Sequence, residues 1–263
     1  MTDTRVALVT GSSAGIGKAV ARSLLADGYS VVITARGADR LEAAAEELGE
    51  HGEVLPVQVD VTDGESVRAL IEEVDEAFGR IDALVNNAGT TGPTEPFEDV
   101  TVEDWQHVFD VNVYSVVRVT QAVLPYLREQ EGVIVNISSD SAIQPDGFMP
   151  QYNASKAAIN SLTKTLSKDL GQDGVRVNAV SPTLTWTPLV ENMFTEEAKE
   201  RDMTVEEVKQ EFLEEDRPGI VFDRPAEPKE VADVVAFLAS EEASFVTGSN
   251  YHVTGGNVET VDM

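Results

Sequence analysis

Residues 5–17 read RVALVTGSSAGIG, and this stretch decides the fold. Its first six residues are apolar or β-branched, which is typical of a buried parallel strand. A turn with Gly11, Gly15 and Gly17 follows, and apolar residues then recur at helical spacing until Gly28. A strand, a tight glycine turn and a helix N-terminus present free backbone N–H groups to an anion. The stretch therefore predicts a phosphate-binding turn at the start of an α/β domain.

The glycine turn does not fit the P-loop pattern G-x-x-x-x-G-K-[ST]. Five residues before Gly17 stands Ser12, and Ala19 follows Lys18 where Ser or Thr would bind magnesium. We therefore exclude a nucleoside-triphosphate enzyme. The turn is T-G-x-x-x-G-I-G rather than the common G-x-G-x-x-G, and a purely structural glycine turn is the alternative at this point.

Composition narrows the class of protein. A chain of 263 residues is long enough for one large α/β domain. It has no cysteine, which excludes disulfides, thiolate metal sites and a cysteine nucleophile. His51, His107 and His252 lack the spacing of metal ligands, so we expect no metal site. We find no signal-peptide pattern and no apolar run of the ~18 residues that a membrane helix needs, and we expect a cytoplasmic protein.

The charge is strongly negative, with 47 acidic and 19 basic residues and a net charge of −28. Such a field repels nucleic acids and anionic membranes, so we expect neither as a partner. The acidic residues are spread over predicted helix faces rather than gathered in a tail. This distribution favours adaptation to a high-salt cytoplasm, where screening removes self-repulsion. An ordinary acidic surface is the alternative.

Strands alternate with helices along the whole chain. We predict strands at residues 5–10, 30–35, 54–59, 83–86, 132–138, 175–181 and 250–253, and helices at 38–49, 63–78, 101–128, 151–170 and 229–238. This order predicts an α/β fold, a single-domain, doubly wound Rossmann sheet of about seven parallel strands with helices on both faces. One domain then covers residues 1–263, with the ligand at the carboxyl ends of the strands.

A lid-like helical insertion is expected at about residues 188–226. Its part from 191 to 216 is strongly acidic, yet Val205, Val208 and Phe212 recur at helical spacing. A helical insertion over the crevice would be a lid. A surface hairpin without a gating role is the alternative.

Three further motifs follow along the chain, two at the ends of predicted strands and one at the start of a predicted helix. Asn86-Asn87-Ala88-Gly89 ends the fourth strand, and Ser138-Ser139 ends the fifth. YNASK then opens the next helix, with Tyr152 and Lys156 on one helical face. With the glycine turn, these motifs resemble the short-chain dehydrogenase/reductase family, in particular its 3-oxoacyl-[acyl-carrier-protein] reductase-like members. The resemblance covers the whole chain and implies a catalytic set of Asn112, Ser139, Tyr152 and Lys156.

The chemistry explains these residue types. Hydride transfer to a carbonyl leaves an alkoxide that needs a proton, and an unperturbed tyrosine, with a pKa near 10, needs a neighbouring ammonium to lower that pKa. The resemblance then makes Tyr152 the general acid in reduction and the base in oxidation. It also makes Lys156 the group that tunes Tyr152 and bonds the nicotinamide ribose. Ser139 would donate to the substrate oxygen, and Asn112 would hold a water.

The residue after the second strand distinguishes the two nicotinamide cofactors. An acid there favours NAD, whereas Arg36 accommodates a 2′-phosphate. We therefore expect NADP(H), with NAD(H) as the alternative. Pro182-Thr183 departs from the family's usual Pro-Gly and leaves the path of that loop open. The implied cofactor contacts are Gly11, Ser12, Ser13, Gly15, Ile16, Gly17, Arg36, Asp60, Val61, Asn87, Ala88, Gly89, Tyr152, Lys156, Pro182, Thr183, Thr185 and Thr187.

The leading hypothesis is an NADP-dependent oxidoreductase for a carbonyl or secondary alcohol, with a 3-oxoacyl thioester reductase as the first substrate class. A sugar or polyol dehydrogenase is the alternative, and a non-catalytic cofactor-binding regulator is the alternative from another class. The family also implies a homotetramer built through the helices at 101–128 and 151–170. Candidate substrate contacts are Ser141, Gln144, Met149, Trp186 and Phe194.

Overall fold

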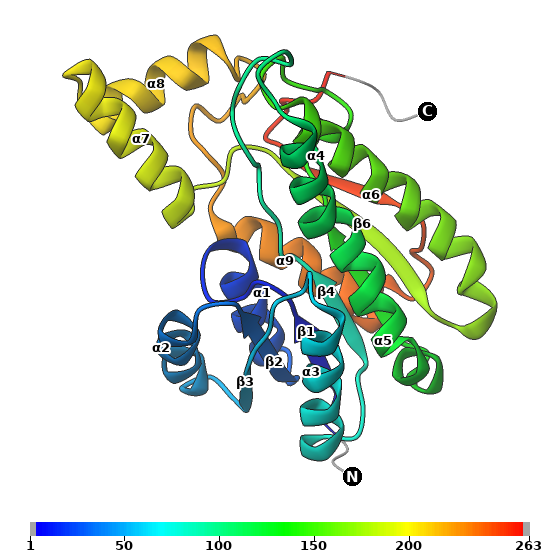
Figure 1. Ribbon diagram of the computed structural model, residues 1–263. Helices are drawn as coiled ribbons and strands as arrows, with labels where there is room; N and C mark the ends of the chain where they lie inside the picture. Colours follow the sequence, from blue (N-terminus) through cyan, green and yellow to red (C-terminus); the bar gives the residue numbers. More distant parts are fainter. Residues whose placement is uncertain (1–3, 260–263) are drawn as a thin grey trace.

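All strands of the sheet run parallel in the computed structural model, which describes residues 4–259 (Figure 1). Their spatial order is β3-β2-β1-β4-β5-β6-β7. The order reverses between β1 and β4, which is where an α/β sheet of this kind opens a crevice. The strands are β1 (Val6–Val9), β2 (Ser30–Ala35), β3 (Val54–Gln58), β4 (Ala83–Asn86), β5 (Val133–Ile137), β6 (Arg176–Pro182) and β7 (Asn250–Val253).

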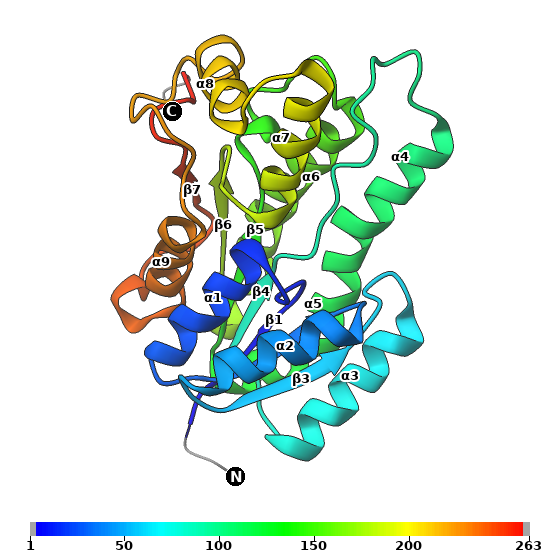
Figure 2. The ribbon, with the colours of Figure 1, turned by 90° about the vertical axis from the view of Figure 1, so that its left-hand side faces the viewer.

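Helices cover both faces of the sheet (Figure 2). One face carries α1 (Gly15–Ala26), α2 (Ala38–Gly49) and α9 (Pro228–Ala239). The other carries α3 (Gly64–Ala77), α5 (Ser115–Gln130) and α6 (Pro150–Asp169). The central strands β1, β2, β4, β5 and β6 are almost entirely buried, as expected for a sheet that is covered on both sides, whereas the edge strands β3 and β7 are only partly buried. The predicted doubly wound fold is confirmed.

The helix predicted at residues 101–128 differs from the structure in one respect. It consists of α4 (Val102–Phe109), a π-helical segment at Asp110–Tyr114, and α5. In this segment the backbone N–H of Ser115 donates to the carbonyl of Asp110, five residues earlier. The Ser115 hydroxyl donates to the carbonyl of Val111. The segment contains Asn112, so the irregular turn coincides with a candidate site residue.

The acidic insertion forms a hairpin of two helices, α7 (Pro188–Arg201) and α8 (Val205–Glu215). Figure 1 shows this hairpin projecting from the sheet at the upper left. It has a small core of its own around Phe194, whose ring lies 5.9 Å from that of Trp186 and 5.4 Å from that of Phe212. The helical spacing predicted within residues 191–216 is confirmed.

One ion pair fastens the end of the hairpin to the body of the protein. Arg217, just after α8, contacts both carboxylate oxygens of Asp146 at 2.9 and 2.6 Å. Both side chains are largely buried, and the Arg217 guanidinium also lies 5.3 Å from the Phe212 ring. Bidentate pairs of this kind fix orientation as well as distance. The hairpin is therefore tied to the loop that precedes α6.

No helix within residues 4–259 combines the length and the apolar character that crossing a membrane requires.

Candidate active site

The glycine turn brings backbone into close contact with the end of β4. Gly11 and Gly15 have φ angles of +64° and +55°, which side chains rarely adopt. A Cβ on Gly17 would lie 2.4 Å from Asn87 Nδ2 and 2.6 Å from the Gly11 carbonyl oxygen. Helix α1 begins directly after this turn, and no side chain caps it. The free N–H groups therefore face the cleft and suit a phosphate group.

Asn87 fastens this turn to the sheet. Its side-chain Nδ2 donates to the carbonyls of Thr10 and Gly11, each at 2.9 Å. The backbone N–H groups of Asn87 and Ala88 both donate to the Thr10 hydroxyl at 3.0 Å. The NNAG motif thus acts on the glycine turn through four hydrogen bonds, and it also lines the cleft.

Ser12 lies under the turn rather than in the cleft. It is fully buried, its hydroxyl donates to Val9 O at 2.7 Å, and its Oγ accepts from the Thr34 N–H. Its own N–H donates to Thr34 O. Both polar groups that could reach a phosphate are therefore engaged in joining β1 to β2. Ser12 is a structural residue of the turn, whereas the neighbouring Ser13 lines the cleft.

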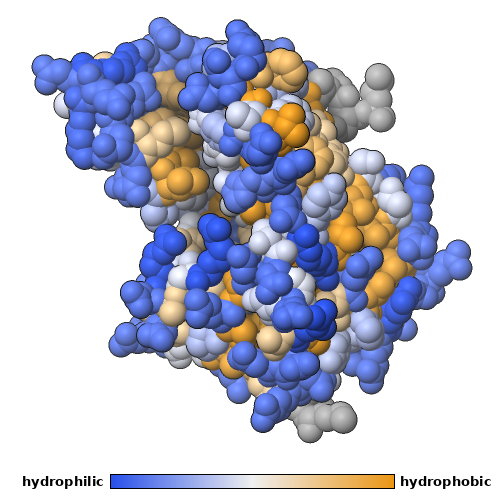
Figure 3. All heavy atoms as spheres, in the orientation of Figure 1, coloured by the Kyte–Doolittle hydropathy of each residue, from blue (hydrophilic) through white to orange (hydrophobic). Residues whose placement is uncertain are grey.

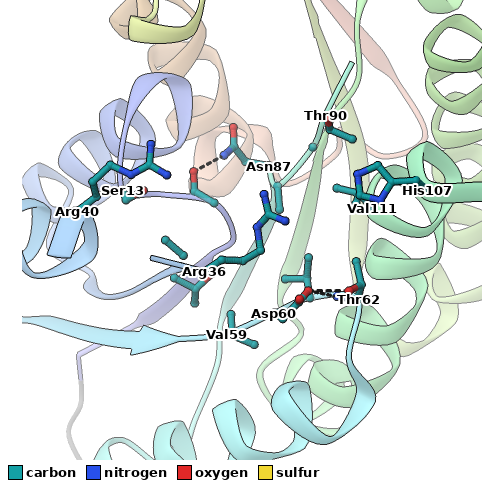
Figure 4. A pocket seen from close by; sticks show the side chains of 16 residues that line it. Ser13, Arg36, Arg40, Val59, Asp60, Thr62, Asn87, Thr90, His107 and Val111 are labelled. Atoms are coloured by element: carbon teal, nitrogen blue, oxygen red, sulfur yellow. Dashed lines mark hydrogen bonds between the residues drawn. The ribbon is translucent and has the colours of Figure 1, made fainter. Parts of the chain in front are cut away.

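Two arginines enter the far end of the cleft (Figure 4). Arg36 follows β2, and Arg40 comes from the first turns of α2. Both side chains are exposed, and neither forms an ion pair with a carboxylate of the described residues. This is unusual in so acidic a chain, where most cations are paired. The Arg36 charge contributes to lowering the pKa of Asp60, although hydrogen bonds from Thr62 are the larger cause.

The other end of the cleft holds the tyrosine and the lysine of the YNASK motif. Tyr152 and Lys156 lie on one face of α6, with the Lys156 Nζ 5.6 Å from the centre of the Tyr152 ring. Lys156 Nζ donates to the Ile137 carbonyl at 2.9 Å. Ser139, at the end of β5, lines the same pocket. The structure thus brings three of the four catalytic candidates to one wall of the cleft.

The fourth candidate, Asn112, lies behind this wall. Its Oδ1 accepts from the Thr90 N–H at 2.8 Å, and its Nδ2 donates to the Thr90 carbonyl at 2.9 Å. The Nδ2 also donates to Ser155 Oγ at 2.9 Å, and the Ser155 hydroxyl bonds the Tyr152 carbonyl. The amide therefore holds the cleft loop to α6. Both Nδ2 donors of Asn112 are taken, so the predicted water is left with one lone pair of Oδ1 and with the backbone.

Burial dominates the proton affinities of the two ionisable groups. It raises the pKa of Tyr152 to about 12, while a hydrogen bond with Ser139 lowers that pKa and the charges of Asp140 and Asp146 raise it. Burial also lowers the pKa of Lys156 to about 8. The expected lowering of the tyrosine pKa by the lysine charge is therefore not seen in this structure. Tyr152 is protonated near neutral pH and fit to act as an acid.

The loop after β6 follows an ordinary path despite its missing glycine. Thr183 is not among the residues with positive φ, so this position does not need glycine. Its N–H donates to Val253 O, and its buried hydroxyl has no hydrogen-bond partner among residues 4–259. Thr187 caps α7 and contacts the glycine turn, because a Cβ on Gly15 would lie 3.2 Å from its methyl group. Pro182, Thr183, Thr185 and Thr187 all line the cleft.

The five candidate substrate contacts do not line the cleft. Phe194 is fully buried in the hairpin core, and Trp186 packs against it. Gln144 bonds Asn257 O and the Glu259 N–H, and Ser141 is buried at the start of a short 3₁₀ turn. Met149 precedes α6 at its N-cap position. Phe194 is thus a core residue of the hairpin rather than a cleft residue.

Other residues form the walls of the cleft. Thr90 and Thr91 follow the NNAG motif, and Leu184, Leu189, Val190 and Asn192 come from the loop and helix after β6. Leu189 is 71% exposed, and Figure 3 shows a hollow beneath the hairpin with apolar residues along it. The sequence carried one usable signal for this wall, namely the short loop that joins the end of β6 at Pro182 to the start of α7 at Pro188.

No cluster of three or more His, Cys, Asp or Glu side chains within residues 4–259 is arranged to hold a metal ion. His107 lines the cleft near Arg36, whereas His51 and His252 lie elsewhere.

Known proteins resemble this chain over nearly its whole length. A family model described as enoyl-(acyl carrier protein) reductase matches residues 11–257. The meso-2,3-butanediol dehydrogenase of Serratia marcescens is 36% identical over 254 residues, which cover 97% of this chain and 94% of that protein.

Two solved structures share the fold over nearly all of both chains. The L-sorbose reductase of Gluconobacter frateurii, in complex with NADPH and L-sorbose, has a TM-score of 0.93 and 37% identity and covers 98% of each chain. The 3-ketoacyl-(acyl-carrier-protein) reductase of Brucella melitensis, in complex with NADH, has a TM-score of 0.84 and 32% identity and covers 97% of this chain and 98% of that one. The chain belongs to the short-chain dehydrogenase/reductase family and is an NAD(P)-dependent oxidoreductase.

Proposed function

We propose that the protein uses NADP(H) to interconvert a carbonyl compound and a secondary alcohol at Tyr152. One observation carries the proposal: a single cleft has a glycine turn and two unpaired arginines at one end and Ser139, Tyr152 and Lys156 at the other. The uncapped start of α1 fits the cofactor's pyrophosphate, and the buried, unpartnered Thr183 hydroxyl offers a further contact.

Each residue of the site has a separate task. The bound nicotinamide supplies or accepts the hydride. Tyr152 gives its proton to the substrate oxygen in reduction and removes it in oxidation. Ser139 holds that oxygen as its charge develops. Lys156 lies beside the Tyr152 ring and stabilises a tyrosinate whenever it carries its proton. Asn112 positions one wall of the cleft, because its side chain is hydrogen-bonded both to Thr90 and to Ser155 of α6.

The choice between cofactors rests on Arg36 and Arg40. Replacing both with alanine removes the charged contacts to a 2′-phosphate, each worth roughly 1.5–3 kcal/mol. We expect the KM for NADPH to rise by at least about 100-fold while the KM for NADH changes little. Initial rates with each cofactor measure this effect. Arg68→Ala, which removes one exposed cation of α3, is the matched control. An equal rise in the KM for NADPH and for NADH would show that the two arginines do not select the cofactor.

Two substrate classes follow from the relatives. Our first candidate is a 3-oxoacyl thioester, because the Brucella melitensis neighbour is a 3-ketoacyl-(acyl-carrier-protein) reductase. The second is a sugar or polyol, favoured by the structural likeness to L-sorbose reductase. Leu184, Leu189 and Val190 give the cleft an apolar wall that suits a partly apolar substrate.

Turnover of acetoacetyl-CoA, L-sorbose and acetoin with each cofactor distinguishes these classes. Cofactor binding without turnover of any carbonyl in a broad panel would instead favour a non-catalytic regulator.

We also propose a homotetramer built through the faces of α4–α5 and α6. Tyr114 is 54% exposed on this face, and a groove there is lined by Trp105, Phe109 and Arg118. Exposed aromatic residues of this kind are typical of protein interfaces. Sedimentation in high salt tests the proposal, and a single species at 28.4 kDa would refute it.

We extend the proposal to a cytoplasm of high salt concentration. The net charge of −28 destabilises the folded state by self-repulsion, which salt screens. We expect the Tm to rise by about 10 °C or more between about 0.1 and 2 M KCl. Differential scanning fluorimetry in KCl, with equal osmolality of sucrose as the control, measures the shift. A Tm that is the same at both salt concentrations would contradict salt adaptation.

A further inference from the structure

A carboxylate lies directly beside the candidate catalytic serine. The Ser139 hydroxyl donates to Asp140 Oδ1 at 3.1 Å, and Ser139 Oγ accepts from the Ser141 N–H at 3.2 Å. Asp140 is only 5% exposed. A buried carboxylate is costly unless its oxygens receive hydrogen bonds, so its presence here needs an explanation.

The second oxygen of this carboxylate is held by a distant part of the chain. Asn257 Nδ2 donates to Asp140 Oδ2 at 2.9 Å across a sequence separation of 117 residues. Asn257 follows β7 and is itself buried. Its carbonyl accepts from Gln144, and the Gly219 backbone packs on it so closely that a Cβ there would lie 2.8 Å from its Cα. Three segments therefore fix the position of Asp140.

The hydroxyl of Ser139 has one proton to donate. Two acceptors lie within its reach, the Asp140 carboxylate and the Tyr152 oxygen. When the proton points to Asp140, one Ser139 lone pair accepts from the Ser141 N–H and the other is left to accept from the Tyr152 hydroxyl or from a substrate alcohol. When Tyr152 is ionised, the serine proton must turn toward the tyrosinate. The acceptor that Asp140 provides thus opposes ionisation of Tyr152.

We propose that Asp140, held by Asn257, is a positioning residue that directs the Ser139 proton away from Tyr152 and so keeps Tyr152 protonated. The inference rests on the roles proposed above for Ser139 and Tyr152. The negative charge of Asp140 also keeps Tyr152 protonated, because it raises the pKa of Tyr152.

Asp140 differs from the other charged groups near Tyr152 in its contact with Ser139. Lys156 lies on the same helix and beside the ring. Asp146 also raises the pKa of Tyr152, but both of its oxygens are paired with Arg217. Among these described groups, Asp140 is the carboxylate that contacts Ser139 itself.

The first test is the pH dependence of alcohol oxidation, which needs ionised Tyr152. In Asp140→Asn, kcat/KM should reach half of its plateau at a pH lower by about one unit than in the unmodified enzyme. Glu72→Gln on the exposed face of α3 removes one charge elsewhere and should leave the profile unmoved. A merely structural role for Asp140 would lower the rate at every pH without moving the profile, and that result would overturn the proposal.

A double-mutant cycle tests the same idea away from the catalytic loop. Asn257→Ala should move the pH profile of alcohol oxidation to lower pH in the otherwise unmodified enzyme and leave it unmoved in Ser139→Ala, because Asn257 acts through Ser139. Equal shifts in both backgrounds, or an unmoved profile in Asn257→Ala, would refute the proposal even if Asp140→Asn does not fold. Absence of any turnover by the unmodified enzyme, or full activity of Tyr152→Phe, would instead refute the proposed function.

Discussion

Tyr152→Phe is expected to lower kcat for carbonyl reduction by about 1,000-fold, the middle of the range for loss of a general acid. Phenylalanine keeps the ring, and Tyr152 is only partly buried, so the packing around this part of α6 changes little. The proton for the alkoxide, however, would then have to come from water. Stopped-flow measurement of hydride transfer with saturating NADPH isolates this step from product release.

Two companion measurements make the result specific. NADPH affinity should change far less than kcat in Tyr152→Phe, because only one of the implied cofactor contacts is lost and the glycine turn and the arginines are untouched. Tyr126→Phe is the matched control, since its hydroxyl bonds Asp75 on the surface of α3 and lies outside the cleft. An unchanged rate of hydride transfer in Tyr152→Phe would show that Tyr152 is not the general acid, and it would favour the alternative of a non-catalytic regulator.

Gly17→Ala is expected to destabilise the fold by about 1–3 kcal/mol, the usual cost of forcing extra volume into a packed site. The added Cβ would lie 2.4 Å from Asn87 Nδ2, 2.6 Å from Gly11 O and 2.9 Å from Ser12 Cα. None of these atoms can move freely. Asn87 Nδ2 holds two carbonyls of the turn, and the other two atoms are backbone. Helix α1 must therefore shift away from the cleft.

The same substitution should weaken NADPH binding, because the N–H groups at the start of α1 move with the helix. Thermal unfolding and equilibrium binding by cofactor fluorescence measure the two effects. Gly64→Ala is the control, since a Cβ at this exposed position on α3 meets nothing within 4 Å. Equal stability of the two variants would show that α1 adjusts without cost.

The sequence predicted the sheet well because each strand is a local apolar run followed by its own helix. The site residues at strand ends, such as Asn87 and Ser139, were also found, because parallel strands bring their carboxyl ends to one edge. Arg40 was missed as a partner of Arg36. The second guanidinium comes from α2, and the pattern at the end of β2 gives no sign that this helix reaches the cleft.

Residues whose environment depends on distant segments were harder to predict. Phe194 was expected at the substrate because it follows the sixth strand closely, but its burial depends on α8, which packs over it. The serine pair in the turn offered no sign that Ser12 points down to β2 while Ser13 faces the cleft. The high pKa of Tyr152 follows from desolvation by the residues packed around it, which no local pattern reveals.

The π-helical segment at Asp110–Tyr114 also sets the register between α4 and α5. A π turn contains one residue more than the α-helical turn that it replaces. Each residue of an α-helix turns the chain by about 100°, so losing this residue would rotate one helix against the other by that angle. Asn112 would then point away from Thr90, while the apolar face of α5 stayed on the sheet. Because of the extra residue, α5 can pack its apolar face on the sheet while Asn112, in the same continuous helical segment, points to Thr90 at the cleft. A regular α-helix cannot satisfy both orientations.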